Sequence, residues 1–445
     1  MTGVKFAFIG GGSLQWAPKL LTDIALTPGL EGSQVDLYDI NAELSGMMER
    51  LGQLISEKAG TGMQVRAVNE RKAALEGADF VIFCIAQGGL EAMRHDLEIP
   101  WRYGIAQPVG DTVGPGGISR ALRHIPVVVE IAREMESLCP DAWLLNLTNP
   151  MTTICRAVTK ATSIRTIGLC HEMHGVKRHL SAILDVPYEA IKVRAAGVNH
   201  LPWILEMTID GRDGFEMLRE WIDRNGVFRF ANEGLDGTYA SVFRDRFAVK
   251  LSLFQVYGAL GAAGDRHLAE FFPHFLTEAN DWGRRFGVEL TTIEHRKQGQ
   301  EWAYQRVKEI VESGELPPLE RSAEQLAPVA AALSGGPEGR FIINIPNEGQ
   351  IPELPLDVTV ETYAWVSQRG VEPLTAGPIP PAIVQILRRV SGEQELIVEA
   401  ALKGDRDLAL QAMLADALVK DWTIAEPMLD ELLAAHAAYL PQFQG

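Results

Sequence analysis

Short apolar runs alternate with amphipathic stretches over roughly the first 200 residues of the chain. Seven of these runs predict β-strands: Val4–Ile9, Gln34–Ile40, Met63–Val68, Ala78–Ala86, Ala142–Thr148, Arg165–Leu169 and Ile191–Val198. The stretches between them carry apolar residues at helical spacing, and Asn41 and Asn149-Pro150 have the residue types that begin helices. Strands that alternate with helices predict an α/β fold with a parallel, doubly wound sheet.

After about residue 200 the pattern becomes mixed and rich in helices. The predicted helices span Tyr239–Leu260, Gly299–Glu312, Ala323–Leu333 and Glu393–Leu418, and the predicted strands span Arg340–Ile345 and Leu356–Thr362. Glu315–Leu319 and the proline-rich Pro373–Pro381 are predicted loops. We therefore expect a nucleotide-binding domain over residues 1–200 and a substrate and oligomerisation domain over residues 201–445.

Composition narrows the class of protein. The chain has 445 residues, 47% of them apolar, and a formal net charge of −17. Nucleic acids and anionic membrane surfaces attract basic faces, so this charge disfavours both as partners. Four cysteines without a C-x-x-C pair, no apolar run of membrane-spanning length and no signal-peptide pattern favour a cytoplasmic enzyme with reduced thiols.

Glycines follow the first predicted strand. Gly10 and Gly12 precede a helix, where a tight turn lets a pyrophosphate approach free backbone N–H groups. Gln15 occupies the place of the third glycine of the dinucleotide fingerprint, and Asp39 ends the second strand, where a carboxylate can accept both ribose hydroxyls. These residues favour a Rossmann-like site for NAD over NADP. The alternative is a structural turn with a surface aspartate.

Two further clusters follow predicted strands. Cys170-His171-Glu172 comes after Arg165–Leu169, and Asn199-His200 comes after Ile191–Val198. If both strands are parallel, their carboxyl ends meet at one edge of the sheet, where doubly wound folds place their sites. Cys170 and His200 then form a candidate metal pair. The alternative for Cys170 is an inert thiol in the core.

Three more clusters lie in predicted loops or at element ends. They are Gly110-Asp111-Thr112-Val113-Gly114-Pro115-Gly116-Gly117, Thr148-Asn149-Pro150 and Gly264-Asp265-Arg266-His267. Each alone is equally consistent with a loop that carries capping residues. Together with Gly10–Ser13, Cys170–Glu172 and Asn199-His200, they resemble the motifs of glycoside hydrolase family 4 in the same order.

The resemblance implies a lactate/malate dehydrogenase-like nucleotide domain with an added substrate domain, assembled as a homodimer or homotetramer. It implies a glycosidase that uses NAD and Mn²⁺ or another divalent metal. Hydride leaves C3 of the sugar for NAD⁺, a base removes the acidified C2 proton with help from the metal, the C1 group is eliminated, and water adds back. Cys-His-Glu at 170–172 resembles the α-galacturonidase branch.

The resemblance also assigns roles to individual residues. Cys170 and His200 would hold the metal. Asp265 would be the C2 base and His171 the acid at the leaving group, with a metal-ligand role as the alternative for His171. The hydroxyls at C2 and C3 would meet Asn149 and Asp111, and the dinucleotide would meet Gly10, Gly12, Ser13 and Asp39.

A uronate substrate needs a local cation, because a chain of charge −17 repels it at long range. Arg94, Arg296 and Lys297 are the candidates. Arg296 comes first, since the planar fork of an arginine suits a carboxylate.

Rival interpretations stay open at this point. One is an NAD-dependent 2-hydroxyacid dehydrogenase without a metal, and another is a non-catalytic nucleotide-binding regulator on the same fold. Within the family, α-glucosidase, α-galactosidase and α-glucuronidase activities are the nearest alternatives.

Overall fold

One 13-stranded sheet organises the chain in the computed structural model, which describes residues 3–444. Eleven of the strands lie in the order β10-β8-β7-β12-β11-β6-β5-β4-β1-β2-β3, while β9 pairs with β8 and β13 pairs with β12. The parallel half consists of β1 (Lys5–Ile9), β2 (Gln34–Tyr38), β3 (Gln64–Ala67), β4 (Phe80–Phe83), β5 (Trp143–Asn146) and β6 (Arg165–Gly168). The predicted α/β class with a doubly wound parallel sheet is therefore confirmed for the first six predicted strands.

Helices cover both faces of the parallel half because side chains alternate along each strand. Phe6 and Phe8 of β1 share a core with α1, α2 and α13, whereas Ala7 and Ile9 share another with α5, α6 and α14. The bounds of these helices are α1 (Ala17–Leu26), α2 (Ala42–Ala59), α13 (Leu326–Leu333), α5 (Gly114–Leu138), α6 (Met151–Ala161) and α14 (Pro381–Lys403). Two apolar layers thus enclose the strands that lead to the glycine turn.

The other half of the sheet is antiparallel. It consists of β7 (Ile191–Val198), β8 (Leu201–Ile209), β9 (Arg212–Asp213), β10 (Leu260–Gly261), β11 (Gly339–Pro346), β12 (Thr359–Ser367) and β13 (Gly370–Pro373). The prediction that Ile191–Val198 extends the parallel set is wrong, because β11 and β12 lie between β6 and β7 and reverse the direction.

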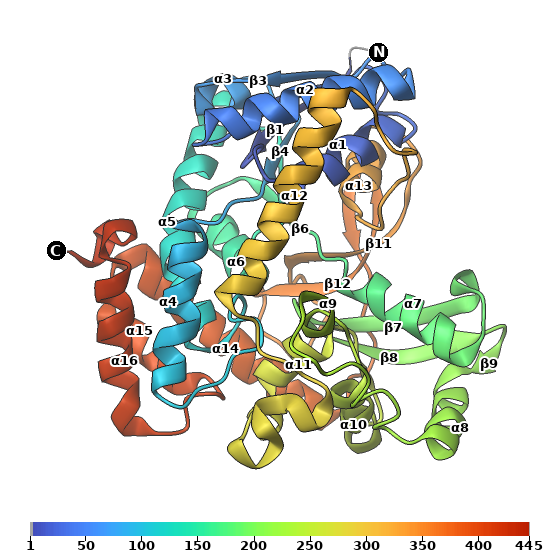
Figure 1. The fold of residues 1–445 in the computed structure, drawn as a ribbon, viewed down its shortest axis with the longest axis vertical. Helices are drawn as coiled ribbons and strands as arrows, with labels where there is room; N and C mark the ends of the chain where they lie inside the picture. Colours follow the sequence, from blue (N-terminus) through green and yellow to red (C-terminus); the bar gives the residue numbers. More distant parts are fainter. Residues whose placement is uncertain (1–2, 445) are drawn as a thin grey trace.

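The sheet also crosses the predicted boundary at residue 200. Strands β11 and β12 come from the second half of the chain and pair with β6 and β7 of the first half. The C-terminal helices α14, α15 (Arg406–Ala415) and α16 (Trp422–Ala435) pack against α4 (Gly89–Arg102) and α5, as Figure 1 shows. The two predicted domains therefore share one sheet and one helical layer, and their boundary stays a prediction.

Two predicted long helices are wrong in their extent. The predicted helix 239–260 is divided into α9 (Tyr239–Val242), α10 (Ala248–Tyr257) and β10, because the buried Arg246 guanidinium gathers backbone carbonyls between the two helices. The predicted helix 393–418 begins earlier, at Pro381, and stops where Gly404 adopts φ +67° before α15. Glycine ends helices in this conformation at little cost.

The remaining elements complete the layers. They are α3 (Arg71–Leu75), α7 (Glu172–Leu184), α8 (Gly214–Asn225), α11 (Asp265–Phe271), α12 (Ile293–Ser313) and the short 3₁₀ segments Tyr188–Ala190, Pro273–Phe275, Glu278–Phe286, Ala437–Tyr439 and Pro441–Phe443. In the described part of the chain, no helix has the length and apolar character needed to cross a membrane.

Candidate active site

A tight turn joins β1 to α1. Gly10 has φ +88°. A Cβ on Gly10 would lie 1.9 Å from the carbonyl oxygen of Cys84, the residue that follows β4. The amides of Gly10 and Gly11 both donate to the Tyr38 carbonyl, at 2.9 and 3.0 Å. Because no side chain fits at Gly10, the turn brings bare backbone to the end of the parallel strands, as an approaching pyrophosphate requires.

Asp39 lies directly after β2 and faces this turn. One carboxylate oxygen accepts the Gly12 amide at 3.0 Å and the other accepts the Asn41 amide at 2.9 Å. Each oxygen retains a further lone pair for a hydroxyl group. The neighbouring Ile40 side chain is 94% exposed. Ser13 lies at the same turn, and its hydroxyl accepts the Trp16 amide.

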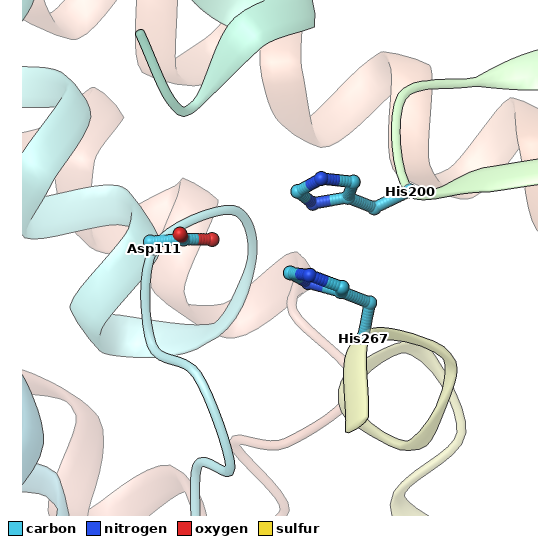
Figure 2. A group of neighbouring side chains, drawn as sticks. All are labelled: Asp111, His200 and His267. Carbon is cyan, nitrogen blue, oxygen red and sulfur yellow. The ribbon is translucent and has the colours of Figure 1, made fainter. Parts of the chain in front are cut away.

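Three groups from separate segments meet at the other end of the site. Asp111 comes from the loop before α5, His200 from the turn between β7 and β8, and His267 from α11. One ligand atom from each residue lies within 4.8 Å of the other two. Figure 2 shows the two imidazole rings and the carboxylate converging on one space.

The protonation of this cluster suits a cation. Burial lowers the pKa of His200 to about 3 and the pKa of His267 to about 4, so both imidazoles are neutral near pH 7. Burial works against ionisation of Asp111, but His267, His200 and Arg120 outweigh it and lower the pKa of its carboxyl. One carboxylate and two neutral imidazoles are typical ligands of a divalent transition metal.

Thr112 fixes the orientation of the His200 ring. Its hydroxyl donates to Asp111 Oδ1 at 2.7 Å and lies 2.8 Å from His200 Nδ1. Because the single hydroxyl proton of Thr112 is donated in the hydrogen bond to Asp111, the Thr112 oxygen must accept the N–H at Nδ1 of His200. The lone pair of His200 is then at Nε2, as in histidines that bind a metal. The His267 ring stacks on the His200 ring with centroids 3.7 Å apart.

Asn149 extends the cluster towards the substrate side. The prediction that Asn149 caps a helix is wrong, since Pro150 is the residue before α6 and the Asn149 amide donates to Asp111 Oδ2 at 3.2 Å. The side-chain amide oxygen of Asn149, Oδ1, is buried without a hydrogen-bond partner among residues 3–444. A buried acceptor without a partner is costly, so a ligand hydroxyl would satisfy it.

The prediction that Cys170 and His200 follow parallel strands to one edge of the sheet is wrong. Strands β6 and β7 run in opposite directions, but Gly168, Asn344, Glu361 and Gly197 form one row across the sheet. Glu361 of this row lies near both Asn199 and Cys170. Asn199 donates to Glu361 at 2.9 Å and also hydrogen-bonds the Cys170 thiol.

The Cys170 thiol itself is buried beside Met151 and Cys155. Burial and the nearby Glu361 and Glu172 raise its pKa well above the ordinary value. A thiolate at this position would need a cation to stabilise it. The predicted metal role of Cys170 thus stays a prediction, while His200 belongs to the group of three residues that could hold a metal.

His171 and Glu172 begin α7. The His171 side chain is 43% exposed, and its ring nitrogens lie 3.3 Å from Glu324 and 3.7 Å from Glu172. A positive charge on His171 would add to the lowering of the pKa of both His200 and His267, which places the side chain in their surroundings. Glu172 accepts the Gly264 amide and joins α7 to the start of α11.

Asp265 has partners of its own. Its carboxylate accepts the Val249 and Lys250 amides at the start of α10, both at 3.0 Å, and the Lys250 ammonium at 2.8 Å. Burial raises its pKa to about 6 although Lys250 opposes the shift. Asp265 thus connects the start of α11 to the start of α10. Within Gly264–His267, the side chain that lies with Asp111 and His200 is His267.

Arginines surround the cluster. The Arg296 side chain is mostly buried, and its Nε has no hydrogen-bond partner within residues 3–444. Burial lowers the pKa of Arg296, whereas Asp111 acts in the opposite direction. Arg266 also has an unpartnered Nε in the described range and donates through Nη2 to the Pro108 carbonyl at 2.6 Å.

Arg94, another predicted substrate residue, lies elsewhere on α4. It pairs with Glu91 at 3.3 Å and Glu98 at 3.0 Å of the same helix. The structure therefore brings Arg296, and not Arg94, into the arrangement around Asp111. Lys297 is exposed on α12.

Several site residues were missed from the sequence. His267, Arg266 and Glu270 all lie on α11, and Lys250 lies on α10. Of these residues, the sequence motif Gly264–His267 includes Arg266 and His267 but neither Glu270 nor Lys250. His267 and Glu270 are three apart and so share a face of α11, and Glu270 accepts the Val109 and Gly110 amides at 2.7 and 2.8 Å. One helix thereby supplies a member of the cluster and holds the loop of Asp111.

This fold and site define a dehydrogenase-like nucleotide-binding protein with a candidate metal site. The chain matches the family 4 glycosyl hydrolase model over residues 5–186 and the C-terminal domain model of the same family over residues 195–419. The chain belongs to glycosyl hydrolase family 4. The dehydrogenase and regulator interpretations are therefore set aside in favour of a glycosidase.

Relatives and solved structures agree. An α-galacturonidase from Bacillus subtilis is 36% identical, and the match covers 97% of each chain. A solved structure of a Bacillus subtilis protein described as a glucosidase has a TM-score of 0.90 and 35% identity, covering 97% of this chain and 100% of the other. The 6-phospho-β-glucosidase of Thermotoga maritima, solved with manganese, NAD⁺ and glucose-6-phosphate, has a TM-score of 0.80, 23% identity and coverage of 98% and 99%.

Proposed function

We propose that this chain is an NAD- and metal-dependent α-galacturonidase. The observation that carries the proposal is the mostly buried guanidinium of Arg296. Its Nε has no hydrogen-bond partner in the described part of the chain, and the Asp111 carboxylate is close enough to affect its pKa. A buried donor without a partner favours a ligand that supplies an acceptor, and a charged donor favours an anionic one. The similarity to an α-galacturonidase supports the same substrate class.

The residues of the glycine turn fit NAD. The Gly10 backbone leaves no room for a side chain, and Asp39 has lone pairs available for ribose hydroxyls. A carboxylate at this place disfavours a 2′-phosphate. The exposed Ile40 side chain beside Asp39 offers an apolar surface to a base. We assign Gly10, Gly12, Ser13 and Asp39 to the dinucleotide, as the sequence predicts.

The donor set around Asp111 fits a divalent metal. His200 has its Nε2 lone pair free, and Asp111 and His267 lie beside it. Cys170 adds a soft ligand if a cation displaces its proton. When bound, NAD⁺ supplies a hydride acceptor for C3 of the sugar and the metal supplies Lewis acidity to the neighbouring oxygens.

The chain's own residues orient the sugar and move protons. The unpartnered side-chain oxygen Oδ1 of Asn149 accepts a hydroxyl of the sugar, and Asp111 lies next to it for the adjacent hydroxyl. His171 is exposed enough to reach a leaving group and is held between Glu172 and Glu324. Asp265 is the proposed C2 base, since its Oδ2 accepts the Val249 amide alone among the described residues and so keeps a lone pair for a proton.

The test compares a uronide with its neutral analogue. Arg296→Ala should lower kcat/KM for an α-galacturonide by about 30-fold or more relative to the neutral α-galactoside, because losing one partner of a buried charge pair costs roughly 2–5 kcal/mol. Arg94→Ala is the matched control, and the ratio should not change, since Arg94 pairs with its own helix.

An outcome that contradicts the proposal is a wild-type enzyme that prefers the neutral galactoside or glucoside. The α-galactosidase and α-glucosidase alternatives within the family would then apply. The cytoplasmic location and the homodimer or homotetramer stay predictions.

A further inference from the structure

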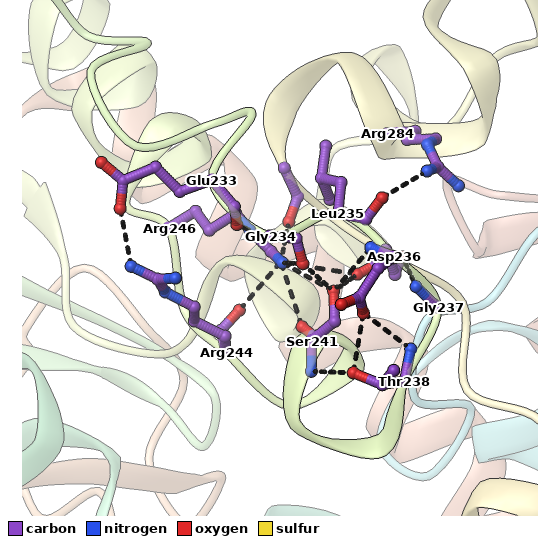
Figure 3. A network of polar contacts seen from close by, with 12 residues as sticks. Glu233, Gly234, Leu235, Asp236, Gly237, Thr238, Ser241, Arg244, Arg246 and Arg284 are labelled. Atoms are coloured by element: carbon purple, nitrogen blue, oxygen red, sulfur yellow. Dashed lines mark hydrogen bonds and ion pairs between the residues drawn. The ribbon is translucent and has the colours of Figure 1, made fainter.

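The segment between α8 and α10 folds back on itself around one arginine. Arg246, whose side chain is fully buried, donates to the carbonyl groups of Glu233, Gly234 and Gly287, each at 2.9 Å. Figure 3 shows the backbone from Glu233 to Ser241 closing around this guanidinium. Five donors in a rigid fork can hold several carbonyls at once, so the segment has one defined conformation.

The same segment is fastened to the start of α12. The Gly237 amide donates to Glu289 at 3.0 Å, and the Gly237 carbonyl lies 2.9 Å from His295 Nε2. His295 belongs to the capping box of α12 with Thr292. The short helix α9, which follows Gly237 directly, is thereby held against the first turns of α12.

Three aromatic rings form a row between α9 and α12. Phe243 lies 4.6 Å from Tyr239, and Tyr239 lies 5.0 Å from Trp302, as measured between ring centroids. Trp302 is 53% exposed, so the row ends at the surface. Gly299 makes room for it, because a Cβ on Gly299 would lie 2.8 Å from the Tyr239 ring.

The inner end of the row meets the arginines of the active site. The guanidinium carbons of Arg266 and Arg296 lie 4.7 and 5.0 Å from the centroid of the Phe243 ring. Cation–π contact with Phe243 therefore holds both guanidiniums next to the cluster. Arg296, Gly299 and Trp302 are three residues apart on α12, so this helix links the proposed carboxylate site to the exposed ring.

We infer that Tyr239 and Trp302 form a subsite for a leaving group that is itself a sugar ring. The inference rests on the proposed function, in which Arg296 binds the carboxylate on C5. In a pyranose C1 and C5 are both bonded to the ring oxygen, so C1 lies two bonds from the carbon that carries the carboxylate. A carboxylate on Arg296 therefore keeps the C1 leaving group near this guanidinium, and Phe243, which contacts Arg296, begins the row that ends at Trp302. Aromatic faces offer apolar area to the C–H face of a sugar, and exposed aromatic rings beside a site mark ligand surfaces.

The test uses two leaving groups on one glycone. We compare kcat/KM for an α-linked digalacturonide and for methyl α-galacturonide, whose leaving group is too small to reach the row. Trp302→Ala should lower the ratio of the two values by about tenfold, the order expected for one aromatic contact. Gly299→Ala should also lower the ratio, since it displaces the Tyr239 ring while improving helix propensity.

Trp422→Ala is the matched control. Trp422 is 77% exposed at the start of α16, so its loss should leave the ratio as in wild type. An unchanged ratio in Trp302→Ala, with an unaltered melting temperature and oligomer size, would overturn the subsite. If the wild type prefers neutral glycosides, the ratio is measured with a digalactoside and methyl α-galactoside. Failure of the uronide proposal is then distinguishable from failure of the subsite.

Discussion

The glycine turn and the Asp111 cluster are built in different ways. The turn is formed by backbone groups within two consecutive β–α units, from Gly10 to Asn41, and its hydrogen bonds join amides to Tyr38 and Asp39. The cluster consists of side chains from three distant segments, the loop before α5, the β7–β8 turn and α11. The glycine turn depends on positions that have no room for a side chain, whereas the Asp111 cluster depends on which side chains come together.

This difference decides how each site responds to substitution. The turn has no spare volume, so an added methyl group affects the fold itself. The cluster holds neutral imidazoles beside an ionised carboxylate, so removing one ligand affects chemistry more than folding.

The largest effect is expected from His200→Ala. Loss of this imidazole should remove metal and lower kcat/KM by about 10³-fold or more, since Lewis-acid assistance contributes several kcal/mol to a transition state. The measurements are metal content after dialysis and turnover of an α-galacturonide with NAD⁺ and Mn²⁺. The melting temperature of the metal-free protein should change little by comparison.

Thr112→Val is the matched variant for this experiment. It keeps the shape but removes the oxygen that accepts the Nδ1 proton of His200. Groups that orient a ligand typically contribute 10–100-fold to metal affinity or activity, so the loss should be smaller than in His200→Ala. Full metal content and activity in both variants would exclude His200 from the metal site.

The second prediction concerns the turn. Gly10→Ala should lower the free energy of unfolding by roughly 3 kcal/mol or more and abolish NAD⁺ binding, because the new Cβ overlaps the Cys84 carbonyl oxygen and the backbone has φ +88°. Gly32→Ala is the control for backbone strain alone. Gly32 has φ +70° with no atom near its Cβ position, so about 1 kcal/mol is expected. Chemical denaturation and NAD⁺ titration measure both, and equal losses would contradict the steric argument.

The same contrast explains what the sequence could predict of the fold. Short runs with buried apolar residues, separated by helical stretches, locate the six parallel strands from pattern alone, and even β3 with its single buried Val65 follows this alternation. The direction of β7 was predicted wrongly because its neighbour β12 lies more than 150 residues away in the chain. The break between α9 and α10 depends on Arg246 collecting distant carbonyls, which no local propensity records.

For the site, local motifs select Asp111 and His200, which the fold brings together, and their roles stay predictions. In the run Gly264–His267 the sequence selects Asp265 as the base, and the fold adds that Lys250 and the α10 amides hold its carboxylate. His267 reaches the cluster only because of where α11 packs. Arg296 could be selected as a candidate for a carboxylate, yet its unpartnered Nε is visible only in three dimensions.

A pH-dependent effect is expected at Glu270, the carboxyl group that ties α11 to the loop of Asp111. Burial raises its pKa to about 8, although the Val109 and Gly110 amides oppose the shift. The unfolded chain ionises near the ordinary value of 4.5. Between these two values the folded state binds the additional proton. The stability from this group is therefore complete below pH 4.5 and is lost as the pH rises through about 8.

Glu270→Gln should flatten this dependence. The glutamine carbonyl can still accept both loop amides but carries no titrating proton, so the loop of Asp111 stays in place. The slope of unfolding free energy against pH, measured with a chelator between pH 5 and 8, should become less negative by up to about 1.4 kcal/mol per pH unit. Glu216→Gln on α8, an exposed carboxyl, serves as the control. A slope that is the same in wild type and Glu270→Gln would mean that Glu270 is ionised in the folded protein. The loop of Asp111 would then be held by an ionised carboxylate. The position of Asp111 would depend on the charge of Glu270, just as its protonation depends on its charged neighbours.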